Sequence, residues 1–147
     1  GELYNHPLEW IELISGRLID FVRCHLSQIG GISVAKKLAN FCDFYRVRTA
    51  WHGPGDVSPV GHAANFHVDF STWNFGIQEY SHPNEATQEV FPGAPIVKDG
   101  TVTLNDKPGI GVDVNEALAA KYPIRDDPPF DLFWGQLRDR DGTVRRP

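Results

Sequence analysis

The chain has 147 residues and a net charge of −5, with 41% hydrophobic and 22% charged residues. This length can bury the core of one ordinary domain, and the composition is that of a globular protein. The acidic balance favours neither nucleic acid nor an anionic membrane as a partner. No apolar run reaches the roughly 18 residues that a membrane-spanning helix needs. We therefore expect neither partner class.

Cysteine and methionine usage adds two expectations. The two cysteines, Cys24 and Cys42, are too few for a disulfide framework and lack the spacing of a metal site. We expect them to be reduced thiols in the core of a cytoplasmic protein. The chain contains no Met, and its start at Gly1 resembles neither an initiator nor a signal peptide. We expect further residues to precede Gly1 in a longer protein.

Helices and strands are predicted to alternate over the first 80 residues. The helices are predicted over residues 7–18, 33–45 and 58–70, with Pro7 at the first helical position and Ser33 and Ser58 as N-caps. The strands, rich in β-branched and aromatic residues, are predicted over residues 19–24, 46–51 and 75–80. They begin about 28 residues apart. Strands that alternate with helices in this way pair in parallel through right-handed crossovers.

Two α/β folds fit this order, a doubly wound sheet and a barrel. No glycine-rich phosphate-binding motif follows any strand, which weakens the nucleotide-binding version. The regular period and short connections favour the barrel. We predict that residues 1–80 form the C-terminal part of a (β/α)₈ TIM-type barrel.

Residues 81–147 are predicted to be a C-terminal extension that packs on the barrel. A hairpin is predicted over residues 95–104, turning at residues 98–100. Asp113 to Glu116 has the pattern of a capping box that opens a short helix ending near Tyr122. The remainder is polar, with one apolar patch over residues 130–134.

Ionisable residues recur where the predicted strands end. Arg23 and Glu79 stand at the ends of their strands, and Glu2 would follow a strand that lies before this chain. His52 follows its strand in a loop rich in Gly and Pro that also contains Asp56. From Glu2 through Arg23 and His52 to Glu79, successive separations are 21 to 29 residues, about one βα unit. We expect these side chains to converge at the face where barrel enzymes act.

Each of these residues also has a simpler explanation. Glu2 could be solvated surface, and Arg23 could form a structural salt bridge. His52 and Glu79 could be structural polar residues, and Asp56 could cap the helix that follows it. Because all five residues lie at or shortly after predicted strand ends, their shared position favours a functional role for each of them.

Three neighbouring aromatic residues are less specific. His62 falls inside a predicted helix and is expected to pack or to lie on the surface. His25 lies near a strand end and is a candidate neighbour of the site. Trp51 could line the site or pack in the core.

Together the five polar residues suit a polar, anionic and hydroxylated substrate. Arginine grips a carboxylate with two parallel hydrogen bonds. Carboxylates bind a hard divalent metal, which stabilises charge that develops on a substrate carboxylate. Histidine exchanges protons near neutral pH, so the residues alone name His52 as a candidate general base.

At these positions the chain resembles the mannonate dehydratase group of the enolase superfamily, which includes proteins called starvation-sensing. The resemblance covers about residues 1–123, because long motifs recur in order. The matching stretches are Gly1-Glu2, Asp20–Arg23 with Gly30-Gly31-Ile32, Arg48–Val60, Asn74–Tyr80, Pro108–Asp113 and Glu116–Pro123.

The resemblance implies a role for each candidate. Glu2 corresponds to the last of three carboxylate ligands to Mg²⁺, beside the substrate. Arg23, His52, Asp56 and Glu79 correspond to substrate-binding positions around a sugar acid. His52 then becomes a substrate contact that can still move protons. The main base and acid, a Tyr and a His, the other two metal ligands and an N-terminal capping domain would all lie upstream of Gly1.

The activity implied is Mg²⁺-dependent dehydration of a sugar acid, with D-mannonate or D-gluconate giving 2-keto-3-deoxy-gluconate. Family members form homo-oligomers, so the resemblance implies one here. Two alternatives stay open: a sugar-acid-binding or regulatory homologue with little turnover, and another enolase-superfamily reaction such as racemisation. The chain departs from the family near its end, where Val144 rather than a tryptophan-containing stretch follows Asp141-Gly142-Thr143. We expect residues 1–147 alone to bind Mg²⁺ poorly and to show no dehydratase activity, because half a barrel leaves strand edges unpaired.

Overall fold

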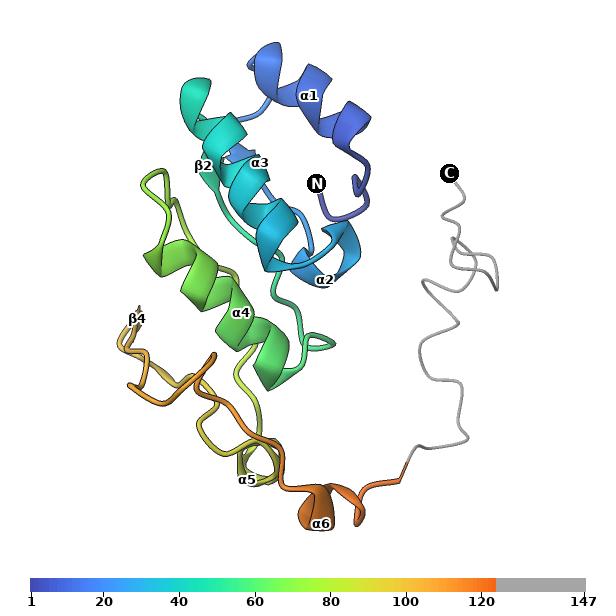
Figure 1. Cartoon of the computed structure of the whole chain (residues 1–147), viewed down its shortest axis with the longest axis vertical. Coiled ribbons are helices and arrows are strands. Elements are labelled where there is room, and N and C mark those ends of the chain that lie inside the picture. The colour runs from blue at the N-terminus through green and yellow to red at the C-terminus, as the bar shows by residue number, and fades with distance from the viewer. Residues whose placement is uncertain (124–147) are drawn as a thin grey trace.

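The computed structural model describes residues 1–123, which alternate between helices and short strands (Figure 1). In chain order the elements are α1 (Pro7–Ser15), β1 (Phe21–Val22), α2 (Leu26–Ile29), α3 (Ile32–Phe44), β2 (Arg48–Thr49), α4 (Pro59–Phe70), α5 (Glu85–Val90), β3 (Val97–Lys98), β4 (Thr101–Val102) and α6 (Glu116–Ala119). The apolar patch at residues 130–134 and the Asp141-Gly142-Thr143 stretch lie outside the described residues. Within residues 1–123, no helix is both long enough and apolar enough to span a membrane.

β1 and β2 pair in parallel, as the alternation of helix and strand predicts. β1 pairs with β2 in the register Phe21 with Arg48 and Val22 with Thr49. The pairing continues past the strands, because the His52 N–H donates to the Cys24 carbonyl at 3.0 Å. On its other side β2 meets the segment after α4 through a parallel bridge between Thr49 and Phe75.

Apolar side chains from the helices cover one side of these strands. Ile14 of α1, Leu38 of α3 and Val68 of α4 are buried beside Val22 and Val47. Figure 1 shows α1, α3 and α4 following one another down the molecule, with the hairpin beside α4 and with α5 and α6 beyond it. Elsewhere on the strand segments Phe21, Phe75 and Ile77 are exposed.

The helix boundaries correct two of the sequence-based expectations. α1 ends at Ser15 and not at Leu18, because the chain leaves the helix at Gly16 and takes a left-handed conformation at Arg17, with φ of 55°. α3 is capped by Gly31 rather than by Ser33. Gly31 has φ of 81° and ψ of −164°, a conformation that glycine adopts without a steric penalty.

Two further predictions agree with the structure, the start of α4 and the hairpin, whereas the predicted bounds of α6 do not, since it ends at Ala119 and not near Tyr122. Ser58 caps α4, its side chain accepting the Gly61 N–H, and Pro59 occupies the first helical position. The predicted hairpin is present, with β3 and β4 antiparallel. The short helix α6 is capped by Asn115 and not by Asp113. The Asp113 carboxylate accepts the N–H of the next residue instead, so it cannot cap the helix.

Candidate functional site

Four of the five predicted site residues meet at the ends of the paired strands. Arg23 directly follows β1, and His52 lies three residues beyond β2. The parallel pairing between residues 20–24 and 48–52 places His52 two positions beyond the residue opposite Arg23, at the same end of the paired strands. Glu79 comes from the segment that pairs with the other side of β2, and Glu2 precedes α1.

Arg23 lies between two carboxylates. Its Nη1 donates to Glu2 Oε2 at 2.5 Å, and its Nη2 donates to Glu79 Oε2 at 2.6 Å. The His52 Nδ1 is 3.0 Å from the same Glu79 oxygen and 3.6 Å from Glu2 Oε2. We call Glu2, Arg23, His52 and Glu79 the four-residue cluster.

The opposite charges of Arg23 and Glu79 stabilise each other in the ionised form. Burial raises the pKa of Glu79, but the Gly53 N–H and Arg23 outweigh that effect and hold it below its usual range. Burial likewise lowers the pKa of Arg23, yet hydrogen bonds to Glu2 and Glu79 raise it above its ordinary value. Arg23 is therefore a fixed cation and Glu79 an ionised carboxylate at neutral pH.

The remaining candidates lie around the cluster. Asp56 is exposed in the turn before α4 and, among residues 1–123, has no hydrogen bond or ion pair with the cluster. Ser58 rather than Asp56 caps the helix. The His25 ring lies edge-on to the His52 ring, with centroids 5.6 Å apart. His62 is buried against Tyr80 with ring centroids 4.8 Å apart, so it packs as expected.

Three residues that support the cluster were not predicted from the sequence. The Gly53 N–H donates to Glu79 Oε2 at 2.9 Å, and a Cβ at Gly53 would overlap the Glu79 carbonyl oxygen. Asn65 of α4 donates to the His52 carbonyl at 3.2 Å. Gln78 donates to the carbonyls of its neighbour Glu79 and of Trp51. The Gly-Pro loop was a sequence signal for Gly53, and the amide of Asn65 within an apolar stretch was a weaker one.

A buried carboxyl lies behind the site. Asp69 of α4 is 7% exposed, and Trp51, the residue before His52, is fully buried in the core. Neither the Asp69 oxygens nor the Trp51 Nε1 completes a hydrogen bond with a described residue. Burial raises the pKa of Asp69 to about 8, and the nearby Trp51 indole lowers it only in part.

Both cysteines are free and buried, as expected. Burial raises the pKa of Cys24 and of Cys42 to about 12. Such thiols are protonated at neutral pH and therefore unreactive.

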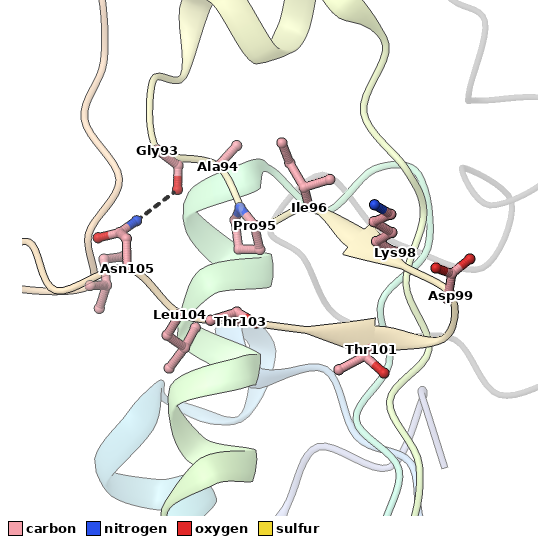
Figure 2. A pocket seen from close by; sticks show the side chains of 11 residues that line it. Gly93, Ala94, Pro95, Ile96, Lys98, Asp99, Thr101, Thr103, Leu104 and Asn105 are labelled. Atoms are coloured by element: carbon pink, nitrogen blue, oxygen red, sulfur yellow. Dashed lines mark hydrogen bonds between the residues drawn. The ribbon is translucent and has the colours of Figure 1, made fainter.

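A separate hollow of about 570 Å³ lies beside the hairpin (Figure 2). Its lining residues run from Gly93 to Ile110, and Asn105 donates to the Gly93 carbonyl across one end. The charged side chains that line it are Lys98 and Asp99. None of its lining residues belongs to the four-residue cluster, so this hollow is separate from the candidate site.

The comparisons with known proteins identify the family. The sequence model of the family described as enolase C-terminal domain-like matches residues 1–118. The chain belongs to this family. The predicted fold, the C-terminal part of a (β/α)₈ barrel, is thereby confirmed. So is the predicted membership in the enolase superfamily.

Curated relatives carry the name of one dehydratase family. The chain is 54% identical over 147 residues to the D-galactonate dehydratase family member RspA of Pantoea ananatis, covering all of this chain and 34% of that protein. It is 51% identical over 148 residues to a D-galactonate dehydratase family member of Enterococcus gallinarum, covering 36% of that protein. The chain thus spans about a third of the length of these relatives.

Solved structures agree with this assignment. An enolase from Pantoea ananatis, crystallised with bound D-gluconate and Mg, matches the whole chain at 54% identity with a TM-score of 0.86, covering 35% of that structure. A mandelate racemase/muconate lactonizing enzyme from Jannaschia sp. CCS1 matches 74% of the chain at 27% identity with a TM-score of 0.64, covering 27% of that structure.

Proposed function

We propose that the chain supplies the substrate-gripping part of a Mg²⁺-dependent sugar-acid dehydratase. The proposed reaction converts D-mannonate or D-gluconate to 2-keto-3-deoxy-gluconate. The observation that carries the proposal is the convergence of Glu2, Arg23, His52 and Glu79 at one strand end. Relatives named as D-galactonate dehydratase family members, and a solved relative with bound D-gluconate and Mg, support the substrate class.

The cluster provides the contacts that a sugar acid needs. The Arg23 guanidinium has five N–H donors, and two of its nitrogens already donate to carboxylates, which fix its position. Its remaining N–H groups can bind an anionic or hydroxylated substrate. Glu79, ionised because its pKa is lowered, can accept hydrogen bonds from substrate hydroxyls. The His52 imidazole can exchange a proton with a bound substrate. Asp56 is proposed as a further substrate contact from the loop.

The donor set of this chain fits part of a magnesium site. Glu2 offers a partly exposed carboxylate, the oxygen ligand that Mg²⁺ prefers. Within residues 1–123, no three His, Cys, Asp or Glu side chains are grouped to hold a metal. Glu2 would therefore bind Mg²⁺ together with ligands from outside the described residues. When bound, the ion stabilises negative charge that develops on the substrate carboxylate.

The organisation of the whole protein follows from the same proposal. We propose that residues 1–80 belong to the barrel and that residues 81–147 form an extension packed on it. We further propose that the protein is cytoplasmic, since the two free cysteines suit a reducing compartment. We also propose that it forms a homo-oligomer.

The test is a screen of the whole protein against a panel of sugar acids with Mg²⁺, following the appearance of a 2-keto acid. We expect turnover of D-mannonate or D-gluconate that is lost in Glu2→Gln. Turnover of other sugar acids alone would overturn the assigned substrate. Binding without turnover of any would contradict the dehydratase proposal and favour the sugar-acid-binding alternative.

A further inference from the structure

The end of β2 is held on one side by side chains instead of backbone. The Thr49 carbonyl still accepts backbone N–H groups from Gly76 and Ile77, both at 3.1 Å. Beyond Thr49, among the described residues, no backbone N–H reaches the carbonyls of Trp51 or His52. The carbonyls of Trp51 and His52, next to the site, therefore lack the backbone partners that continued strand pairing would supply.

Two side-chain amides take over the missing hydrogen bonds. Gln78 Nε2 donates to the Trp51 carbonyl at 2.9 Å and to the Glu79 carbonyl at 2.6 Å. Asn65 Nδ2 donates to the His52 carbonyl at 3.2 Å. Consecutive carbonyls at Trp51 and His52 are thus bound by amides from α4 and from the segment that follows it.

The placement of Asn65 suggests more than packing. Asn65 is 1% exposed in the middle of α4. Asparagine is a weak helix former, and a buried amide is costly unless it is hydrogen-bonded. A leucine would suit the same position better for stability alone. The hydrogen bond to the His52 carbonyl accounts for an asparagine at this buried position.

Gln78 acts at a point where two segments approach closely. A Cβ on Gly53 would overlap the Glu79 carbonyl oxygen and would lie 3.1 Å from Gln78 Nε2. Because Gln78 donates to both segments, it fixes the approach of the backbone that carries His52 to the backbone that carries Glu79. At this approach His52 Nδ1 and Glu79 Oε2 lie 3.0 Å apart.

We propose that Asn65 and Gln78 are positioning residues that hold His52 against Glu79 through the backbone carbonyls at the end of β2. The proposal rests on the proposed function for its catalytic consequence, and on geometry alone for its structural one. Neither residue is assigned a contact with substrate. Their effect passes entirely through the placement of His52 and Glu79.

The test uses isosteric variants that remove each donor, Asn65→Leu and Gln78→Met, in the whole protein. The matched control is Asn74→Leu, because Asn74 Nδ2 also donates to two backbone carbonyls, those of Ala39 at 3.0 Å and Val47 at 2.8 Å. The control removes the same kind of bond near the opposite end of β2. It separates a loss of stability from a loss of positioning.

Crystal structures of the variants measure the positioning without reference to activity. In Asn65→Leu and in Gln78→Met we expect the distance from His52 Nδ1 to Glu79 Oε2 to grow by about 1 Å, a displacement large enough to matter for catalysis. In Asn74→Leu it should stay the same. An unchanged distance in both test variants would overturn the proposal, whether or not the protein dehydrates sugar acids.

Kinetics measure the consequence for turnover. We expect kcat to fall at least about tenfold in the two test variants, with a smaller change in KM and an altered pH profile. Asn74→Leu should lower Tm yet keep kcat and the pH profile of the parent. If the test variants lose only Tm, or if the control loses as much kcat, Asn65 and Gln78 are merely structural. If the parent itself shows no turnover, the proposed function fails and the crystallographic distance still decides the positioning.

Discussion

Replacing the buried carboxyl Asp69 with asparagine should stabilise the protein, and the gain should depend on pH. Asp69 has a pKa of about 8 in the folded chain against an ordinary value of 3.8, because burial disfavours its charged form. A carboxyl whose pKa is higher in the folded chain than in the unfolded chain contributes its full stabilisation at pH values below the unfolded-state pKa. That stability is lost as the pH rises toward the folded value. Asp69 should thus weaken the fold progressively from about pH 4 to pH 8.

The size of the effect follows from the two pKa values. Each pH unit between them costs about 1.4 kcal/mol of folding free energy, so the cost at pH 7 is about 4 kcal/mol. Asparagine stays neutral at every pH and avoids this cost. Between pH 5 and pH 8 the cost grows by about 4 kcal/mol, so at about 2 to 4 °C per kcal/mol the difference in Tm between Asp69→Asn and the parent should grow by about 8 to 16 °C.

Scanning calorimetry at pH 5 and pH 8 measures this difference directly. Asp106→Asn, at an exposed position, is the matched control for the same chemical change. It should show no comparable gain. An equal Tm difference at both pH values, or a loss of stability in Asp69→Asn at pH 8, would refute the prediction.

Three further predictions concern the site and the core. Gly53→Ala should reduce turnover at least about tenfold and lower Tm, because its Cβ would overlap the Glu79 carbonyl oxygen; parent-like kinetics would show that the loop yields easily. Arg23→Met should raise the KM for a sugar acid about tenfold, and change the free energy of unfolding by only about 1 kcal/mol since its ion pairs are partly exposed; an unchanged KM would remove Arg23 from substrate binding. Cys24 and Cys42 should resist a disulfide reagent at pH 8 and react after denaturation, because burial raises both pKa values to about 12; rapid labelling of the folded protein would contradict their burial.

The sequence predicted the alternation of elements because its signals are local. Ser58 and Pro59 mark the start of α4 by capping chemistry, which needs no tertiary contact. Gly31 displaced Ser33 as the cap of α3, because the backbone takes a conformation there that suits glycine. Such a conformation depends on how the preceding helix α2 ends, which residue types alone do not specify.

The candidate site was predictable as far as it follows from strand ends. The period of one βα unit is enough to group Glu2, Arg23, His52 and Glu79, because parallel strands bring their carboxyl ends to one face. The same period could not separate Asp56, which shares the loop but has no partner in the cluster among the described residues.

The supporting residues could not be predicted because their roles are tertiary. Asn65 lies thirteen positions from His52 and on a different element. Gln78 and Asp69 act likewise on Trp51 and its neighbours. One weak signal existed, a polar amide within an otherwise apolar stretch of α4. It gave no indication of which carbonyl the amide would bind.

The most direct test of the central claim is the product of the whole protein acting on D-mannonate and D-gluconate with Mg²⁺. Mass spectrometry would follow the loss of one water from the sugar acid. We predict a dehydrated 2-keto-3-deoxy product that forms with the parent, disappears on chelation of Mg²⁺, and is strongly reduced in Arg23→Met. Quantitative recovery of both sugar acids, with Mg²⁺ present and the protein folded, would contradict the proposed function.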